Sequence, residues 1–316
     1  MTTHFKFMKM ILILLIVWII IYLLNETTFL YKEPIKYNLP NYSNLISPLA
    51  SPIFHTNSNS NAVIIFYHGY KATPQEFRDI AYTFVKEYNV VVPLYPGHGV
   101  SEENFKKTYF SQWYTYAKDI YLDNRRKYKK VYICGLSMGG LISLRLAEEF
   151  SFDANLAPDG VISISTPVFL NNLLKNGIFY DWRLYFTRFI SWFIDELKET
   201  IKEVDDDGAN WIGYEGKIFP KQVHSLKMGM LITRKNLSKI TVPILLMHSK
   251  GDKTAPFKNL FYIANHISSA FIKIRTFDLR KYQHTRHLLT LYNSTKEEVT
   301  YEIRCFLNQL NQLKTK

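Results

Sequence analysis

The chain has 316 residues, of which 47% are hydrophobic and 21% are charged, and its formal net charge is +12. This composition is typical of a folded globular protein and excludes long-range disorder. Its two cysteines suggest no disulfide framework, and no zinc-finger spacing or other nucleic-acid-binding motif accompanies the basic charge, so we predict no metal, no cofactor and no nucleic-acid partner.

The first predicted element is an apolar N-terminal helix. Met10 to Leu24 is a run of 15 apolar residues, and extension back to Phe5 gives 20, about enough to cross a hydrocarbon core of ~30 Å. Lys6 and Lys9 could reach the headgroups from that end. No Ala-x-Ala cleavage pattern follows the run. We therefore predict an uncleaved membrane anchor over residues 1–25, with a cleaved signal peptide or a buried soluble helix as alternatives.

The segment after the anchor is predicted to be a tether. Residues 26–50 contain three prolines and many Asn, Ser and Tyr residues. Because a short N-terminal tail usually stays inside, we expect a single-pass protein whose large domain, residues 51–316, lies on the outer face of the membrane.

Within residues 51–316, short apolar runs alternate with helical patterns. Continuous β-branched runs between helices predict an α/β fold, in which helices cover both faces of a mostly parallel sheet. The predicted strands are 51–56, 62–67, 90–93, 131–134, 161–165, 242–248 and 271–277, and the main predicted helices are 74–86, 113–128 (capped by Ser111), 139–150 and 296–310.

One long stretch, residues 166–239, interrupts this alternation and contains no convincing sheet strand. Its first part is rich in aromatic residues, which either pack internally or line an acyl pocket. We predict that the stretch is an inserted helical cap over the carboxyl edge of the sheet. Its run Asp205–Gly208 lacks the ligand spacing of a calcium loop and is expected to be a solvated loop.

The clearest chemical motif is Gly135-Leu136-Ser137-Met138-Gly139, which lies between a predicted strand and a predicted helix. A tight turn in this context projects the serine from the strand end, and the two glycines allow strand and helix to approach closely. The amides of the helix N-terminus favour a developing negative charge. Ser137 is therefore the predicted nucleophile of a serine hydrolase.

A serine nucleophile needs a base, and the base needs an orienting acid. Asp252 follows the strand that ends at His248 and is the predicted acid, with Asp278 as the alternative. The loop between the last strand and the last helix offers His287 and His284. We favour His287 because Leu288-Leu289 can support its ring from behind. The chain order of serine, acid and histidine is the order expected for the α/β-hydrolase fold.

The tetrahedral intermediate also needs donors for its oxyanion. The amide of Met138, directly after the nucleophile, is one predicted donor. The amide of Tyr70, in the turn that follows the strand 62–67, is the other. His68 and His98 are expected to shape their loops and to take no part in the chemistry.

Together these residues resemble the bacterial carboxylesterases and monoacylglycerol lipases of the α/β-hydrolase superfamily. The resemblance runs from about Ala62 to the C-terminus, and it is most specific in the nucleophile motif and in Pro93-x-Tyr-x-Gly-His-Gly99. It implies a helical cap, no metal, and short- to medium-chain esters or monoglycerides as substrates. The family usually has Phe where this chain has Tyr70, but a backbone amide is unaffected by that change.

The leading functional hypothesis is a membrane-anchored hydrolase of lipid-like carboxylic esters that forms an acyl-enzyme on Ser137. A thioesterase or acyltransferase, or a peptidase of small peptides, could use the same three residues. A membrane-tethered binding protein that has lost its activity is the non-enzymatic alternative. The shape of the cap decides among the enzymes.

Overall fold

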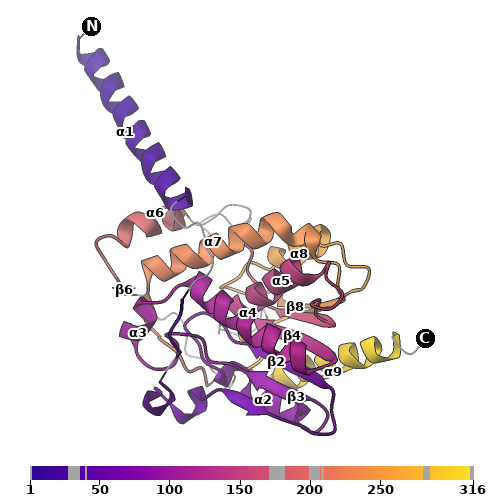
Figure 1. Ribbon diagram of the computed structural model, residues 1–316. Coiled ribbons are helices and arrows are strands. Elements are labelled where there is room, and N and C mark those ends of the chain that lie inside the picture. The colour runs from indigo at the N-terminus through magenta and orange to yellow at the C-terminus, as the bar shows by residue number, and fades with distance from the viewer. Residues whose placement is uncertain are drawn as a thin grey trace.

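A seven-stranded sheet forms the centre of the computed structural model (Figure 1), which describes residues 2–27, 36–39, 41–170, 182–198, 207, 210–279 and 285–313. The strand order is β1-β3-β2-β4-β5-β8-β9. Only the edge pairing of β1 with β3 is antiparallel. The mostly parallel sheet is thus confirmed. Its strands are β1 (Ile53–His55), β2 (Ala62–Tyr67), β3 (Asn89–Val92), β4 (Lys130–Leu136), β5 (Gly160–Ile164), β8 (Ile244–Ser249) and β9 (Ile272–Phe277).

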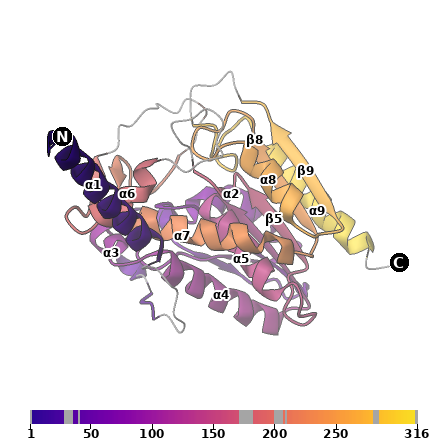
Figure 2. The same cartoon turned by 90° about the horizontal axis from the view of Figure 1, so that it is seen from above.

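Helices cover both faces of this sheet, as predicted (Figure 2). Side chains of α4, α5 and α8 pack on one face, and those of α2 and α9 pack on the other. The α-helices are α1 (Thr2–Thr27), α2 (Gln75–Phe84), α3 (Glu102–Lys106), α4 (Phe110–Lys127), α5 (Met138–Phe150), α6 (Trp182–Ile190), α7 (Pro220–Asn236), α8 (Lys258–His266) and α9 (Lys296–Leu313). Short 3₁₀ turns lie at Tyr42–Asn44, Pro48–Ala50 and Leu237–Lys239.

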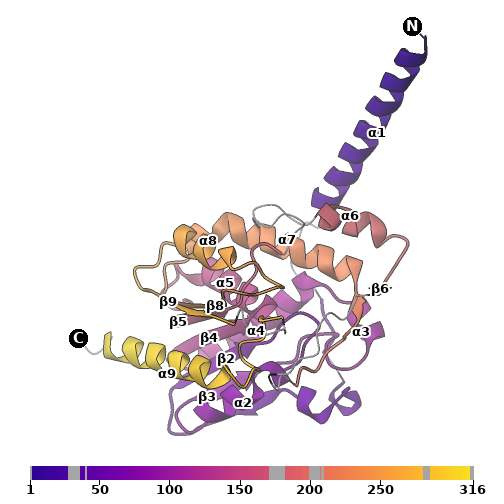
Figure 3. The same ribbon diagram turned by 180° about the vertical axis from the view of Figure 1, so that it is seen from behind.

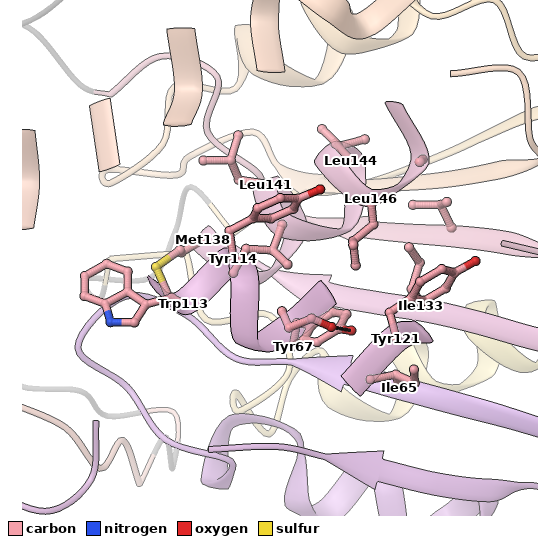
Figure 4. Close-up of a cluster of buried hydrophobic side chains, with 14 of the residues drawn as sticks. Ile65, Tyr67, Trp113, Tyr114, Tyr121, Ile133, Met138, Leu141, Leu144 and Leu146 are labelled. Atoms are coloured by element: carbon pink, nitrogen blue, oxygen red, sulfur yellow. Dashed lines mark hydrogen bonds between the residues drawn. The ribbon is translucent and has the colours of Figure 1, made fainter. Parts of the chain in front are cut away.

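The alternation of side chains along β2 explains why its sequence is apolar throughout. Ile65 and Tyr67 enter the core beneath α4 and α5, whereas Ile64 and Phe66 enter the core beneath α2. Figure 4 shows part of the first core, where Tyr67 lies near Tyr121 of α4. A strand buried on both faces must be apolar at every position. Such continuous apolar runs are the pattern from which the parallel sheet was predicted.

The start of α4 differs from the prediction. Ser111 does not cap this helix: the helix begins one residue earlier, at Phe110, and Ser111 is buried in its first turn. Phe110 packs into the core, and its N–H donates to Oγ of Ser225 in α7 at 3.0 Å. Oε1 of Gln112 accepts from the N–H of Tyr109 at 3.2 Å. The start of α4 is therefore held by one tertiary contact, from Phe110 to Ser225, and by one local contact, from Tyr109 to Gln112.

A cluster of basic residues at 125–130 lies where α4 ends and β4 begins. Three of its residues form the last turn of the helix, where cations oppose the helix dipole favourably. Arg125 also pairs with Asp159 at 2.6 Å. These contacts give the cluster a structural role at the end of the helix.

The described part of the segment 166–239 lies outside the main sheet. It contains α6, α7 and a two-residue antiparallel pair, β6 (Leu197–Lys198) with β7 (Lys217–Ile218), which the sequence did not predict. Trp192 and Phe193 both contact Phe189, but they remain 51% and 72% exposed. Of the predicted loop 205–208, only Asp207 is described, and its Oδ1 accepts from the N–H of Ser294 at 3.2 Å.

The N-terminal helix α1 projects away from the rest of the protein (Figures 1 and 3). It has 26 residues and is therefore ~39 Å long at 1.5 Å per residue. Its apolar window His4–Ile21 has a mean hydropathy of 2.2 and is 0% buried. Helices α6 and α7 lie at the base of α1, on the same side of the sheet.

Candidate active site

The register of the sheet brings the loops that follow its parallel strands to one edge. Tyr67 of β2 aligns with Gly135 of β4, and Leu136 aligns with Ile164 of β5. The parallel pairing continues from β5 through β8 to β9, where Ser249 pairs with Phe277. Because parallel strands end on the same side, the segments that follow β2, β4, β5, β8 and β9 meet there. These segments contain every residue that we predicted to be catalytic.

Backbone strain marks the same edge. Within the described ranges, the non-glycine residues with positive φ are Lys71, Ser137, Ser165 and Arg286, at 61°, 55°, 47° and 59°. Each lies in one of the loops at the carboxyl edge. Strained backbone of this kind costs ~1–3 kcal/mol per residue and clusters at functional sites. The molecule therefore stores its unfavourable geometry around the predicted nucleophile.

Ser137 lies at the sharp turn between β4 and α5, with φ 55° and ψ −116°. Its N–H donates to the carbonyl of Ile164 at 2.8 Å, which fixes the turn against β5. A Cβ atom at Gly135 would lie 2.1 Å from the backbone of Gly139, and one at Gly139 would lie 1.8 Å from the carbonyl oxygen of Tyr67. Only glycine fits at these two positions, as the motif predicted.

Asp252 and His287 form a buried hydrogen-bonded pair. Nδ1 of His287 donates to Oδ2 of Asp252 at 2.8 Å, and the Asp252 side chain is 0% exposed. The other oxygen, Oδ1, accepts from the N–H groups of Thr254 at 2.8 Å and Ala255 at 2.7 Å. The carboxylate is therefore fixed at both ends and sets the orientation of the imidazole.

Charge controls the protonation of this pair. Burial alone would raise the pKa of Asp252, but the neighbouring His287 and His248 outweigh it and lower that pKa. Burial alone would lower the pKa of His287, but the charge and hydrogen bond of Asp252 outweigh it and raise that pKa. Each member of the pair thus favours the charged form of the other.

The second ring nitrogen of His287 is available for chemistry. Nε2 is buried and has no hydrogen-bond partner within the described part of the chain, and neither has Oγ of Ser137. The N–H of His287 donates to the hydroxyl of Tyr292 at 3.3 Å, and Leu289 is fully buried behind the loop. Catalytic hydrogen bonds are often long or unformed before substrate binds.

The alternative acid and base are placed less favourably or are not described. Asp278 follows β9, but it is Asp252 that accepts the hydrogen bond from Nδ1 of His287. His284 lies outside the described residues. The geometry thus favours Asp252 and His287, the pair that the sequence favoured.

The two predicted oxyanion donors lie in the turns after β2 and β4. Met138 is the first residue of α5, so its amide belongs to the helix N-terminus. Tyr70 follows Gly69, and its ring contacts Phe105 and Trp113. A backbone amide does not depend on the identity of its side chain, so the amide of Tyr70 stays the predicted second donor.

His68 and His98 belong to the packing of these loops. Both are fully buried, and their rings are 5.2 Å apart. Nδ1 of His68 is 3.0 Å from the carbonyl oxygen of Gly69, and burial lowers the pKa of His98 to about 3. Both rings are neutral at ordinary pH, which fits the structural role that we expected.

Two functional candidates, His248 and Glu76, were missed from the sequence. Nε2 of His248 lies 3.2 Å from Oδ2 of Asp252 and 3.1 Å from the carbonyl of Ala255. Glu76 is buried beside the turn of Gly69, and its carboxylate also accepts from the indole of Trp211. The position of His248 at a strand end was a usable signal. The contact between Glu76 and Trp211 spans 135 positions, and no signal in the sequence pointed to it.

The chain matches the family described as serine aminopeptidase, S33, over residues 58–290. It is 25% identical to the thermostable monoacylglycerol lipase of Bacillus sp. strain H-257 over 221 residues. The aligned region covers 70% of this chain and 81% of that protein. It is 21% identical to the carboxylesterase of Bacillus subtilis strain 168, over 83% of this chain and 99% of that one.

Solved structures share the fold. A structure from the pair of metagenome-derived lipolytic enzymes LipS and LipT aligns with a TM-score of 0.71 at 20% identity, over 83% of this chain and 98% of that one. A soluble variant of monoglyceride lipase from Saccharomyces cerevisiae aligns with a TM-score of 0.66 at 16% identity, over 82% and 91%.

Proposed function

Since this chain belongs to the serine aminopeptidase S33 family of α/β hydrolases, we propose that it hydrolyses carboxylic esters through an acyl-enzyme on Ser137. The observation that carries the proposal is the orientation of His287. Its Nδ1 is held by Asp252 at 2.8 Å, which leaves the buried Nε2 as the base. The strained turn at Ser137, at the same edge of the sheet, supplies the nucleophile.

In the proposed reaction, Nε2 of His287 takes the proton of the Ser137 hydroxyl as Oγ attacks the ester carbonyl carbon. The amides of Met138 and Tyr70 donate to the oxyanion of the tetrahedral intermediate. The imidazolium, stabilised by Asp252, then gives its proton to the departing alcohol. Water, deprotonated by the same imidazole, attacks the acyl-enzyme and releases the carboxylic acid and Ser137.

We propose substrates with short or medium acyl chains, or monoacylglycerols. Two relatives bear the names monoacylglycerol lipase and carboxylesterase, which supports this class. The described part of the proposed cap, residues 166–239, lies on the side of the protein from which α1 projects, and it presents Trp192 and Phe193 as exposed apolar side chains. A lipid-like ester is the substrate that such surroundings favour.

The description of the family favours one second candidate, an aminopeptidase of small peptides. An aminopeptidase must hold the α-ammonium group of its substrate beside a carboxylate. Besides Asp252, the buried carboxylate that His287 influences is Glu76, but both of its oxygens accept hydrogen bonds from protein donors, Gly69 and Trp211. The ester remains the better-supported substrate.

We propose that α1 is an uncleaved single-pass anchor over residues 1–25, with residues 26–50 as a tether and the hydrolase domain on the outer face. The exposed apolar window and the length of α1 support this proposal. Alkaline extraction of membranes tests it. Full-length protein should stay in the membrane fraction, and its release as a full-length soluble chain would exclude a spanning helix.

A panel of substrates tests the proposed activity. Nitrophenyl esters of graded chain length, a monoacylglycerol, a thioester and an aminoacyl nitroanilide should be assayed with wild type and with Ser137→Ala. We expect hydrolysis of the esters by wild type and none by the variant. Turnover of the anilide without turnover of any ester would replace the proposal with a peptidase.

A further inference from the structure

Glu76 is a buried carboxylate that bridges two distant segments. It lies in the first turn of α2, and its residue surface is 2% exposed. Oε2 accepts from the N–H of Gly69 at 2.6 Å, and Oε1 accepts from Nε1 of Trp211 at 2.9 Å. Gly69 belongs to the turn that carries the oxyanion donor Tyr70, and Trp211 belongs to the proposed cap. One side chain thus joins the turn to the cap.

The cap segment 210–217 is docked against this turn along its length. The N–H of Tyr214 donates to the carbonyl of Lys71 at 3.1 Å, and Oγ1 of Thr73 donates to the carbonyl of Ile212 at 3.1 Å. A Cβ atom at Gly213 would lie 2.3 Å from the carbonyl oxygen of Lys71. The segment therefore cannot move without disturbing the backbone of residues 69–73.

The turn itself depends on this support. Lys71 adopts a φ of 61°, so its backbone is strained. The hydrogen bond from Gly69 to Glu76 is charge-assisted when the carboxylate is ionised, and such bonds are about twice as strong as neutral ones. A Cβ atom at Gly69 would lie 3.1 Å from Oε2 of Glu76, so the carboxylate lies directly against the turn.

Glu76 also acts on the catalytic base. Burial raises the pKa of Glu76 to about 7, and its hydrogen bonds to Gly69 and Trp211 and the charge of His287 oppose that rise. Glu76 in turn adds to the effect of Asp252 in raising the pKa of His287. A buried carboxylate is costly unless hydrogen bonds compensate it, and here the compensating donors come from the turn and from the proposed cap.

We propose that Glu76 is a positioning residue for the oxyanion turn, and that its contact with Trp211 couples the turn to the cap. The inference rests on the proposed function of Ser137. In this account the carboxylate of Glu76 holds both the indole of Trp211 and the turn that contains the amide of Tyr70. Displacement of the cap by a poorly fitting substrate would release the carboxylate and disorder the oxyanion donor, so the coupling links substrate fit to rate.

Four variants of the full-length protein test the coupling: Glu76→Gln, Trp211→Phe, the double variant, and Glu148→Gln as a matched control. An amide at position 76 can accept from one of the two N–H donors but presents its NH₂ to the other. Trp211→Phe removes only the indole end of the bridge. Glu148 is likewise a buried glutamate, but it lies in α5 and is paired with Arg145.

The readouts are kcat and KM for p-nitrophenyl butyrate, the rate of inactivation by a fluorophosphonate, and thermal unfolding. We expect Glu76→Gln to lower kcat and the inactivation rate by about 10- to 100-fold, somewhat less than the loss of an oxyanion donor, with KM within about twofold. Trp211→Phe should lower kcat and the inactivation rate by about three- to tenfold. The double variant should match Glu76→Gln within about twofold, because the bridge is already broken. Glu148→Gln should match wild type.

Two results would overturn the inference. One is a folded Glu76→Gln protein with kcat unchanged within about twofold. The other is multiplication of the two single effects in the double variant, which would make the contacts independent. If Glu76→Gln does not fold, an unchanged kcat in Trp211→Phe is sufficient to reject the coupling. A wild type that neither hydrolyses esters nor reacts with the fluorophosphonate would instead reject the proposed function.

Discussion

Nδ1 of His287 donates a hydrogen bond of 2.8 Å to Oδ2 of Asp252. The other carboxylate oxygen of Asp252 is occupied by two backbone N–H groups, so the carboxylate cannot turn away from the ring. This contact fixes the tautomer in which Nε2 is the free base. The predictions below begin from it.

Replacement of Asp252 by asparagine should leave the fold intact and lower kcat for ester hydrolysis by about 10³- to 10⁴-fold, because an amide favours the wrong tautomer of His287. The matched control is Asp278→Asn, which changes the alternative acid on the next loop and should stay within about twofold of wild type. Steady-state kinetics on p-nitrophenyl butyrate measure both. A severe loss in Asp278→Asn with a mild one in Asp252→Asn would reverse the assignment.

The pH dependence of kcat/KM should report the ionisation of His287. The base must be neutral to accept a proton, so the rate should rise with pH. Asp252 raises the pKa of His287, and the midpoint should therefore lie above the ordinary value of about 6.5. In Asp252→Asn the residual rate should show a lower midpoint, because the negative charge is gone. An unchanged or higher midpoint in that variant would contradict the pairing.

His248 is predicted to support the acid through Oδ2 of Asp252, the same oxygen that His287 contacts. Its Nε2 lies 3.2 Å from Oδ2 of Asp252, and it helps to lower the pKa of that carboxyl. His248→Leu should reduce kcat by about tenfold, or ~1.4 kcal/mol, which is the size of one hydrogen bond to a charged group. His248→Gln retains an N–H donor and should lose less than about threefold. Equal losses in both variants would point to packing alone.

Gly139→Ala should destabilise the protein strongly, because the added Cβ would lie 1.8 Å from the carbonyl oxygen of Tyr67. We expect a loss of about 1–3 kcal/mol or more in the free energy of unfolding, as for other overpacked positions. Ser143→Ala is the control one turn along α5. Its Oγ donates to the carbonyl of Gly139 at 2.9 Å, and its loss should cost no more than about 1 kcal/mol. Chemical denaturation compares the two, and similar losses would argue against a steric origin.

The sequence predicted the sheet and the order of the site residues well, because these depend on local patterns. The continuous apolar run of β2 and the glycines around Ser137 each carry their structural reason in neighbouring residues. The acid and base could be placed because both follow predicted strands. Their catalytic roles, like those of Met138 and Tyr70, remain predictions.

Contacts between distant segments could not be predicted. The start of α4 depends on Ser225, which lies 115 positions away, so local capping preferences selected Ser111 wrongly. Glu76 has the appearance of an ordinary acidic residue in the first turn of a helix, and its burial follows only from the docking of the segment that contains Trp211. The pair β6 and β7 has two residues in each strand, too few for a periodic pattern.

The central claim is that Ser137 forms the covalent intermediate, and mapping of a covalent adduct tests it most directly. The full-length protein should be treated with a fluorophosphonate, digested and analysed by mass spectrometry, beside Ser137→Ala. The account predicts one adduct, on the peptide that contains Ser137, and neither adduct nor ester hydrolysis in the variant. A modified serine elsewhere, or labelling that persists in Ser137→Ala, would contradict it.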